Sequence, residues 1–322
     1  MRRFLTNFFT FLIVPCGLLA LTYLTGDSSA HAEAAPIQVV DDLGRTVSLK
    51  EPAKHIISLY GAFTEMLFAI GAGPDVVART QADQFPPEIT KLPSVGTHMR
   101  PNVEMILGLK PDLVVYSASR RDTAPELDRL RETGLSVAVF EPRTFNEIFS
   151  VVKRLGVLTG RENEAQNAVA GLQKRLDAVK GRLAGITKPQ RVFFEVRAEP
   201  LTAAGRSSIV QEIFTAAGAE NALKNDKAIV QYSFEALLLD NPDVYIVQQG
   251  PMNRNPADPR RRSHFEQLRS IREGKVIFVD EFLYSRPGPR CVDAVEQLAA
   301  ALYPDRLPKD AMEQSGAPAK DH

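Results

Sequence analysis

Apolar residues at helical spacing, followed by β-branched runs, recur along most of the chain. Two such units are near-copies: residues 102–115 read NVEMILGLKPDLVV and residues 233–247 read SFEALLLDNPDVYIV. In each unit a small polar residue can cap a helix, and a Glu follows in the first turn, where the helix dipole favours negative charge. A Pro-Asp pair then ends the helix, and an apolar run typical of a buried parallel strand follows. The sequence therefore predicts one helix-turn-strand unit in each of two similar lobes.

The remaining pattern extends this alternation. A hairpin is expected at 37–49, and strands are expected at 56–59, 76–78, 113–116, 137–140, 191–196, 244–248 and 276–279. Helices are expected at 63–70, 125–133, 145–159, 209–217, 265–270 and 291–302. Alternating strands and helices are typical of a parallel α/β architecture. The predicted fold class is α/β, with two Rossmann-like lobes and a ligand cleft between them.

The longest helical signal lies midway along the chain. Apolar side chains recur at three- and four-residue steps, at Ala165, Ala168, Val169, Leu172, Leu176, Val179 and Leu183. A helix over 161–185 would be about 37 Å long, enough to join two lobes, although an ordinary packed surface helix would show the same pattern. The predicted organisation is an N-terminal lobe over 36–160, a linking helix over 161–187 and a C-terminal lobe over 188–307.

Both ends of the chain differ from the rest. Arg2 and Arg3 precede an apolar run over 4–24, and Ala30-His31-Ala32 fits a cleavage site, so residues 1–32 are predicted to be a secretory signal peptide. A membrane anchor is the alternative, since the run approaches the length of a span. Lipid attachment at Cys16 is a second alternative, which the preceding proline fits poorly. Residues 308–322 are polar and aperiodic, and are predicted to be a disordered tail.

Composition narrows the classes of function. The 322 residues suggest two domains, and the zero net charge argues against nucleic acid as the main partner. After removal of a signal peptide only Cys291 would remain, so no internal disulfide could form. An exported protein without disulfides fits a periplasm-like space, and it would depend on its apolar cores for stability. Cys291 is expected to be a small buried residue.

The chain carries no familiar catalytic or cofactor motif. Gly71-Ala72-Gly73 follows a helix and lacks the third glycine of a dinucleotide loop, and a phosphate loop, a nucleophile elbow and a His-Glu-x-x-His motif are all missing from the sequence. The five histidines are scattered, at positions 31, 55, 98, 264 and 322. No resident metal or cofactor is therefore expected. An exported α/β enzyme with hydrolase-like activity remains an alternative, because catalytic triads are spread along sequences.

Several stretches, in this order and spacing, resemble one known family. They are Val40-Asp41-Asp42-Leu43-Gly44-Arg45, Ile57-Ser58-Leu59 through Thr64-Glu65, Val95-Gly96 through Pro101-Asn102-Val103-Glu104, Leu109-Lys110-Pro111-Asp112-Leu113-Val114, Ala217-Gly218-Ala219-Glu220-Asn221 and Arg286-Pro287-Gly288-Pro289-Arg290. The chain resembles the helical-backbone substrate-binding proteins of ABC transporters, which capture ferric siderophores, haem and cobalamin. The resemblance covers residues 37–305 and implies a periplasmic, non-catalytic protein with two lobes on one long helix.

The resemblance also implies a partner. In that family one Glu on each lobe forms a salt bridge with arginines of the permease dimer in the inner membrane. Motif position places these carboxylates at Glu104 and Glu235. The residues alone indicate only two helix-start carboxylates.

The ligand is less sharply indicated. His98 stands where relatives carry a ligand contact, and it is expected to touch the ligand, to coordinate its metal, or to lie free in a loop. Tyr60, Tyr284 and Arg286 are candidate partners that could stack on a ligand or hold a carboxylate, or could instead be packing residues. Met99 is expected to pack. The overall pattern ranks a corrinoid first, a ferric siderophore second and haem third, so the cargo would contain cobalt or iron.

Overall fold

The computed structural model describes residues 35–118 and 125–307. The predicted signal peptide at 1–32 and the predicted tail at 308–322 lie outside the described residues. Across the described part of the chain, no helix is long and apolar enough to cross a membrane.

The first sheet has four parallel strands in the order β4-β3-β7-β8. Its strands are β3 (Ile56–Ser58), β4 (Val76–Ala78), β7 (Leu113–Ser117) and β8 (Ser136–Phe140). The predicted hairpin precedes it, as β1 (Ile37–Val40) and β2 (Thr46–Leu49), and a smaller one is formed by β5 (Gly96–Thr97) and β6 (Arg100–Pro101). The helices of this half are α1 (Gly61–Ala69), α2 (Val103–Gly108), α3 (Pro125–Glu132) and α4 (Phe145–Thr159), with 3-10 turns at Gly73–Asp75 and Pro87–Lys91.

The second sheet combines parallel and antiparallel strands. Its order is β12-β10-β9-β13-β14, and β11 pairs with β9 outside this path. The bounds are β9 (Gln190–Arg197), β10 (Thr202–Ala204), β11 (Ala219–Asn221), β12 (Ile229–Gln231), β13 (Val244–Gln249) and β14 (Val276–Asp280). The helices are α6 (Ile209–Ala216), α7 (Phe234–Asp240), α8 (Arg269–Arg272), α9 (Glu281–Tyr284) and α10 (Cys291–Leu302), with 3-10 turns at Pro259–Arg261 and Phe265–Gln267.

The two near-copies in the sequence fold into matching units. Asn102 accepts a hydrogen bond from the backbone of Met105 at 3.0 Å and begins α2, while Ser233 accepts one from Ala236 at 3.1 Å and begins α7. Lys110, with a φ of 49°, and Asn241, with a φ of 39°, follow these helices in the left-handed region. The backbone therefore reverses at the same place in both units, before the proline.

The aspartate of each Pro-Asp pair fastens its unit to a neighbouring strand. The Asp112 carboxylate accepts hydrogen bonds from the backbone N–H groups of Lys54, at 2.7 Å, and His55, at 3.0 Å. The Asp243 carboxylate likewise accepts one from the backbone of Arg191 at 2.9 Å. These donors lie at the starts of β3 and β9, which pair with β7 and β13. The repeated Pro-Asp pair thus aligns neighbouring parallel strands in both sheets.

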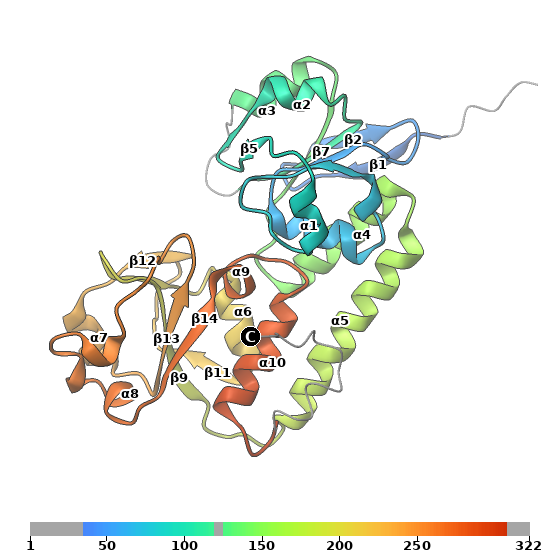
Figure 1. Ribbon diagram of the computed structural model, residues 1–322. Coiled ribbons are helices and arrows are strands. Elements are labelled where there is room, and N and C mark those ends of the chain that lie inside the picture. Colours follow the sequence, from blue (N-terminus) through green and yellow to red (C-terminus); the bar gives the residue numbers. More distant parts are fainter. Residues whose placement is uncertain (1–34, 119–124, 308–322) are drawn as a thin grey trace, which may run out of the picture. The chain divides into compact units, whose positions relative to one another are not determined.

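Helix α5 (Glu162–Arg182) joins the two halves (Figure 1). Near its start it packs so closely on α4 that a Cβ at Gly156 would lie 2.6 Å from the Cβ of Ala165. In its second half Arg175 forms ion pairs of 2.6 Å with Asp293 and Glu296 of α10. At 1.5 Å per residue its 21 residues span about 32 Å. The α/β fold class with a long linking helix is confirmed.

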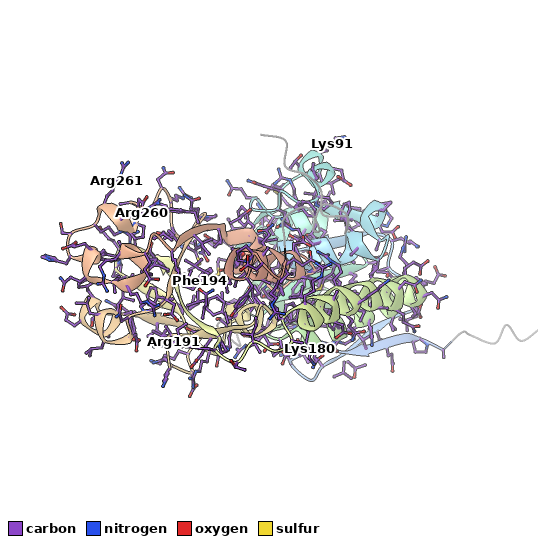
Figure 2. All side chains as sticks on the ribbon, turned by 90° about the horizontal axis from the view of Figure 1, so that it is seen from below. Lys91, Lys180, Arg191, Phe194, Arg260 and Arg261 are labelled. Carbon is purple, nitrogen blue, oxygen red and sulfur yellow. The ribbon has the colours of Figure 1, made fainter. Side chains whose placement is uncertain are left out.

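The inner faces of both sheets contribute to one continuous apolar cluster. It runs from Phe140 of β8 through Leu155 of α4 and Val169 of α5 to Phe194 of β9. Each sheet also buries a separate cluster on its other face. Figure 2 shows Phe194 inside the molecule and charged side chains such as Arg261 at its periphery. The shared cluster ties both halves and the linking helix together.

Candidate functional site

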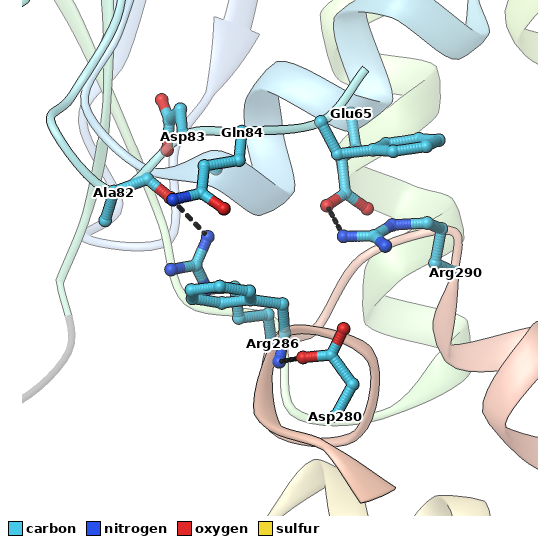
Figure 3. A pocket seen from close by; sticks show the side chains of 10 residues that line it. Glu65, Ala82, Asp83, Gln84, Asp280, Arg286 and Arg290 are labelled. Atoms are coloured by element: carbon cyan, nitrogen blue, oxygen red, sulfur yellow. Dashed lines mark hydrogen bonds and ion pairs between the residues drawn. The ribbon is translucent and has the colours of Figure 1, made fainter. Parts of the chain in front are cut away.

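A small charged cavity lies where loops from both sheets meet. It has a volume of roughly 190 Å³. Its lining comes from α1, from the segment after β4, from the end of β14, from α9 and from the loop between α9 and α10: Gly61, Glu65, Ala82, Asp83, Gln84, Phe85, Asp280, Phe282, Arg286 and Arg290 (Figure 3). Ligands of α/β sheets bind beyond the carboxyl ends of the strands, and the cavity lies at that edge of both sheets.

An ion pair joins the two sides of this cavity. Arg290, at the start of α10, contacts the buried carboxylate of Glu65 on α1 at 2.6 Å. Burial raises the pKa of Glu65, while the Arg290 hydrogen bond and charge act in the opposite direction. The Arg290 guanidinium also lies 4.1 Å from the ring centroid of Phe85. Arg290 therefore holds two side chains of the opposite half.

Asp83 is buried beside this pair and is fully engaged by hydroxyl and amide donors. It accepts hydrogen bonds from the Thr80 hydroxyl at 2.8 Å, the Thr80 backbone at 3.1 Å and the Thr64 hydroxyl at 3.2 Å. Burial raises the pKa of Asp83, and the Thr80 hydrogen bonds and the Arg286 charge oppose that rise. Asp83 thus places a fixed acidic group against the cavity.

Arg286 faces Asp83 from the second half. Its guanidinium carbon lies 3.9 Å from the ring centroid of Phe282, and its Nη1 donates a long hydrogen bond of 3.5 Å to the carbonyl of Ala82. A Cβ on Gly61 would lie 2.6 Å from Arg286 Nη1 and 2.7 Å from Asp83 Oδ1. Glycine at position 61 therefore leaves the space that the guanidinium occupies.

Tyr60 and His98, both predicted ligand contacts, lie beside each other. Their ring centroids are 5.9 Å apart at an interplanar angle of 61°. Burial raises the pKa of Tyr60 to about 12, against the lowering effect of Arg286. Burial lowers the pKa of His98, and Arg286 lowers it further, while Asp83 raises it. Tyr60 and His98 are thus neighbours, and the charge of Arg286 acts on both.

Tyr284 does not join this group. Its side chain is 1% exposed, and its ring stacks on Phe194 with centroids 6.1 Å apart, inside the shared core. The prediction that Tyr284 contacts a ligand therefore does not fit its position, because the last turn of α9 directs this ring inward. Phe282, two residues earlier, lines the cavity instead. Met99 was predicted to pack, which is wrong, because its side chain is 62% exposed.

Sequence reasoning also missed other charged and aromatic residues of the cavity, among them Glu65, Asp83, Phe85 and Arg290. Glu65 and Arg290 stand inside stretches that carried the family resemblance, but no pattern paired them. Asp83 and Phe85 lie in an irregular segment after β4 that has no hydrophobic period. Only their position next to α1 in space identifies these two residues as part of the site.

Glu104 and Glu235 lie exposed in the first turns of α2 and α7. Neither carboxylate forms an ion pair with any residue that the structure describes. Both are therefore free to meet a cation on another molecule.

Among residues 35–118 and 125–307 no group of three or more His, Cys, Asp or Glu side chains is arranged to hold a metal ion. Cys291 is buried and unbridged, as expected of a small core residue. Arginine, carboxylate and aromatic side chains line the cavity.

Comparison with known proteins places the chain in a family. The model of the periplasmic binding protein family matches residues 56–282. An uncharacterized ABC transporter substrate-binding lipoprotein, YvrC of Bacillus subtilis, is 30% identical over 303 residues, covering 89% of this chain and 95% of that protein.

Two solved structures of solute-binding proteins share the fold. The periplasmic vitamin B12 binding protein BtuF of Vibrio cholerae is 28% identical, with a TM-score of 0.68 over 78% of this chain and 97% of that one. A possible iron-binding periplasmic solute-binding protein of Staphylococcus epidermidis is 27% identical, with a TM-score of 0.69 over 79% of this chain and 100% of that one. These relatives are solute-binding proteins and not enzymes, which argues against the hydrolase-like alternative. The chain belongs to the periplasmic binding protein family.

Proposed function

We propose that this protein captures a metal-chelate nutrient outside the cytoplasm and delivers it to the permease of an ABC importer. The observation that carries this proposal is the charged cavity at the carboxyl ends of the strands of both sheets. Arg286 supplies guanidinium donors there, and the only hydrogen bond that this guanidinium makes to a described residue is the long one to Ala82. A ligand carboxylate, phosphate or amide oxygen can accept from the remaining donors.

Three residues are proposed as ligand contacts. Arg286 would hold an acceptor group of the ligand, and the Tyr60 ring would contact an apolar face. His98, whose lowered pKa favours the neutral imidazole at pH 7, would hydrogen-bond the ligand or coordinate its metal.

Three candidate ligands are ranked: a corrinoid is proposed first, a ferric siderophore second and haem third. Vitamin B12-binding proteins support the first place: one from Vibrio cholerae is 27% identical over 78% of this chain and 90% of that protein. The iron-binding relative from Staphylococcus epidermidis supports the second. In each case cobalt or iron would arrive as part of the cargo.

Glu104 and Glu235 are proposed to dock the two lobes onto arginines of a permease dimer. Their exposure, their lack of ion pairs to described residues and their matched positions in the two repeated units support this role. A two-fold partner presents the same surface twice, which suits two similar units. The proposed lobes are 36–160 and 188–307, with the linking helix over 161–187.

An absorbance titration tests the ligand assignment. The purified protein would be mixed with cyanocobalamin, haemin and a ferric hydroxamate siderophore, and the bound fraction measured after gel filtration. We expect one stoichiometric complex, with an affinity that falls about tenfold or more in His98→Ala. The exposed His264 provides a matched control, since His264→Ala should bind as the wild type does. Binding of none of the three chelates would overturn the proposal.

A further inference from the structure

Two residues of the charged cavity depend on a very short helix. Helix α9 has four residues, Glu281–Tyr284; it carries Phe282, and Arg286 follows two residues after its end. A helix of this length is not stable by itself, because forming its first turn costs more conformational entropy than its few hydrogen bonds offset. The positions of Phe282 and Arg286 therefore depend on what holds α9 in place.

The core holds the apolar side of α9. Leu283 and Tyr284 are buried, and the Tyr284 ring stacks on Phe194. Apolar burial is non-directional, so it keeps α9 on the core without fixing how the helix is turned. Directional contacts at the ends of α9 must fix this orientation.

Gln248 of β13 supplies such a contact at the end of the helix. Its side chain is fully buried, and its Oε1 accepts a hydrogen bond from the hydroxyl of Ser285, the residue that follows α9. A buried amide costs free energy when it is unpaired, so this hydrogen bond ties the residue before Arg286 to the sheet.

The start of α9 is held from the same strand and from the loop after it. The backbone N–H of Met252 donates a 2.7 Å hydrogen bond to the buried carboxylate of Glu281. Burial raises the pKa of Glu281, and the Met252 hydrogen bond, the Arg286 charge and a hydrogen bond from the Gln248 side chain oppose that rise. A Cβ on Gly250 would lie only 2.4 Å from the Cβ of Glu281, so glycine at position 250 permits this close approach. Gln248 thus contacts the residues at both ends of α9.

Gln248 is itself fixed by a buried polar network. Its backbone carbonyl accepts a 2.8 Å hydrogen bond from Asn253 Nδ2, which also donates to the Glu195 carboxylate at 3.1 Å. Glu195 is 0% exposed and accepts a further hydrogen bond of 2.9 Å from Arg262 Nη2. The Gln248 Nε2 donates a long hydrogen bond of 3.4 Å to the carbonyl of Val196. The sheet therefore holds this amide in place, and the amide can hold α9 in turn.

We propose that Gln248 is a positioning residue of the ligand site, because it contacts both ends of α9 and so holds Phe282 and Arg286 against the cavity. The proposal rests on the proposed function, in which the Arg286 guanidinium binds the ligand. Gln248 does not line the cavity, so it acts through α9 and not by touching the ligand. The guanidinium carbon of Arg286 lies 3.9 Å from the ring centroid of Phe282, so a turn of α9 would displace both groups together.

Hydrogen exchange of the ligand-free protein, followed by mass spectrometry, tests whether Gln248 holds α9. In Gln248→Leu and in Ser285→Ala the backbone amides of residues 281–286 should exchange about fivefold faster, while helix α4 keeps its wild-type rate. Ser285→Thr retains the hydroxyl and should restore the slow exchange. Gln231→Leu is the matched control, because Gln231 is exposed on β12 of the same sheet, and it should exchange as the wild type does.

Two results of this measurement would overturn the positioning role. One is an unchanged rate over 281–286, and the other is an equal rise over 281–286 and α4, which would mean a general loss of stability. Should Gln248→Leu fail to fold, Ser285→Ala gives the same decision, because it removes only one hydroxyl from a half-buried side chain.

A double-variant cycle tests whether the effect reaches the ligand through Arg286. Absorbance titrations with cyanocobalamin, haemin and ferric desferrioxamine would compare the wild type, Gln248→Leu, Arg286→Ala and the double variant. We expect Gln248→Leu to weaken binding about tenfold when Arg286 is present and less than about twofold in Arg286→Ala. Equal losses in both backgrounds would overturn the role through Arg286. Binding of none of the three chelates would contradict the proposed function, whereas the exchange measurement needs no ligand and still decides whether Gln248 holds α9.

Discussion

Arg290 at the start of α10 pairs with Glu65 of α1 at 2.6 Å, so one ion pair joins the two halves of the protein in the lining of the charged cavity. The same guanidinium rests on Phe85 of the first half. Next to it, Gly288 approaches so closely that a Cβ there would lie 3.3 Å from the Cβ of Ala62. These contacts fix the second half against α1 at a point far along the chain from the linking helix.

Replacing Arg290 should therefore destabilise the fold. Arg290→Met leaves the buried Glu65 carboxylate without its partner, and we expect a loss of about 2–4 kcal/mol in the free energy of unfolding. Urea denaturation followed by circular dichroism measures it. Arg143→Met is a matched control, because Arg143 forms an exposed ion pair with Glu141, and it should change stability by less than about 0.5 kcal/mol. Equal stability of the two variants would show that the Arg290 pair contributes nothing.

The buried carboxylates should also give stability an unusual pH dependence. Burial raises the pKa of Glu65 and of Asp83 in the folded state, so the folded protein binds more protons than the unfolded chain. The stability that these two groups contribute is fully present below their pKa values in the unfolded chain, about 4. It is lost as the pH rises through their higher pKa values in the folded protein. Urea denaturation between pH 4 and 7 measures how the free energy of unfolding changes with pH. In Asp83→Asn the part of this change that comes from Asp83 should be missing. A variant slope identical to that of the wild type would contradict the raised pKa.

Gly61 is predicted to be a sensitive position although it touches no ligand by a side chain. In Gly61→Ala the new methyl group would meet Arg286 Nη1 and Asp83 Oδ1 at less than 3 Å, which forces the guanidinium away from its place. We expect ligand affinity to fall about tenfold or more, together with a loss of about 1–3 kcal/mol in stability. Gly108→Ala adds a methyl group in open space and should keep full affinity. Retained affinity in Gly61→Ala would remove Arg286 from the proposed contacts.

The two exposed carboxylates should separate transport from binding. The double variant Glu104→Ala/Glu235→Ala should abolish ligand uptake by proteoliposomes that contain the importer of the same organism. Ligand affinity should stay within about twofold, because neither residue lines the cavity. The matched control Glu132→Ala/Glu266→Ala should transport normally. Glu132 ends α3 and the exposed Glu266 lies in the 3-10 turn Phe265–Gln267, so neither belongs to α2 or α7. A large affinity loss in the first variant would place its carboxylates in the ligand site instead.

Local physics explains which parts of the fold the sequence predicts. Asn102 and Ser233 cap their helices, and the Pro-Asp pairs stop them, because these effects involve residues close together in the chain. The second sheet contains additional short strands, β10, β11 and β12, that sequence analysis did not predict. Such short strands have too few residues for a recognisable period, and their pairing depends on tertiary contacts.

The candidate site was harder to predict than the fold. Tyr60, His98 and Arg286 were predicted as ligand contacts from loops expected beyond the strand ends and from the family resemblance, and their ligand roles stay predictions. Tyr284 was misplaced because four residues of α9 decide whether its ring faces the cleft or the core, and sequence spacing does not. Asp83 accepts hydrogen bonds from Thr80, three residues earlier, and from Thr64 on α1, so its burial against α1 could be recognised only in three dimensions.

The most direct measurement is the affinity of the wild type and of Arg286→Ala for cyanocobalamin, haemin and a ferric siderophore, determined by absorbance titration. The account predicts one stoichiometric complex with the wild type, weakened about tenfold or more in Arg286→Ala, with the folded state retained by circular dichroism. Unchanged affinity in Arg286→Ala, or no complex with any of the three chelates, would contradict it.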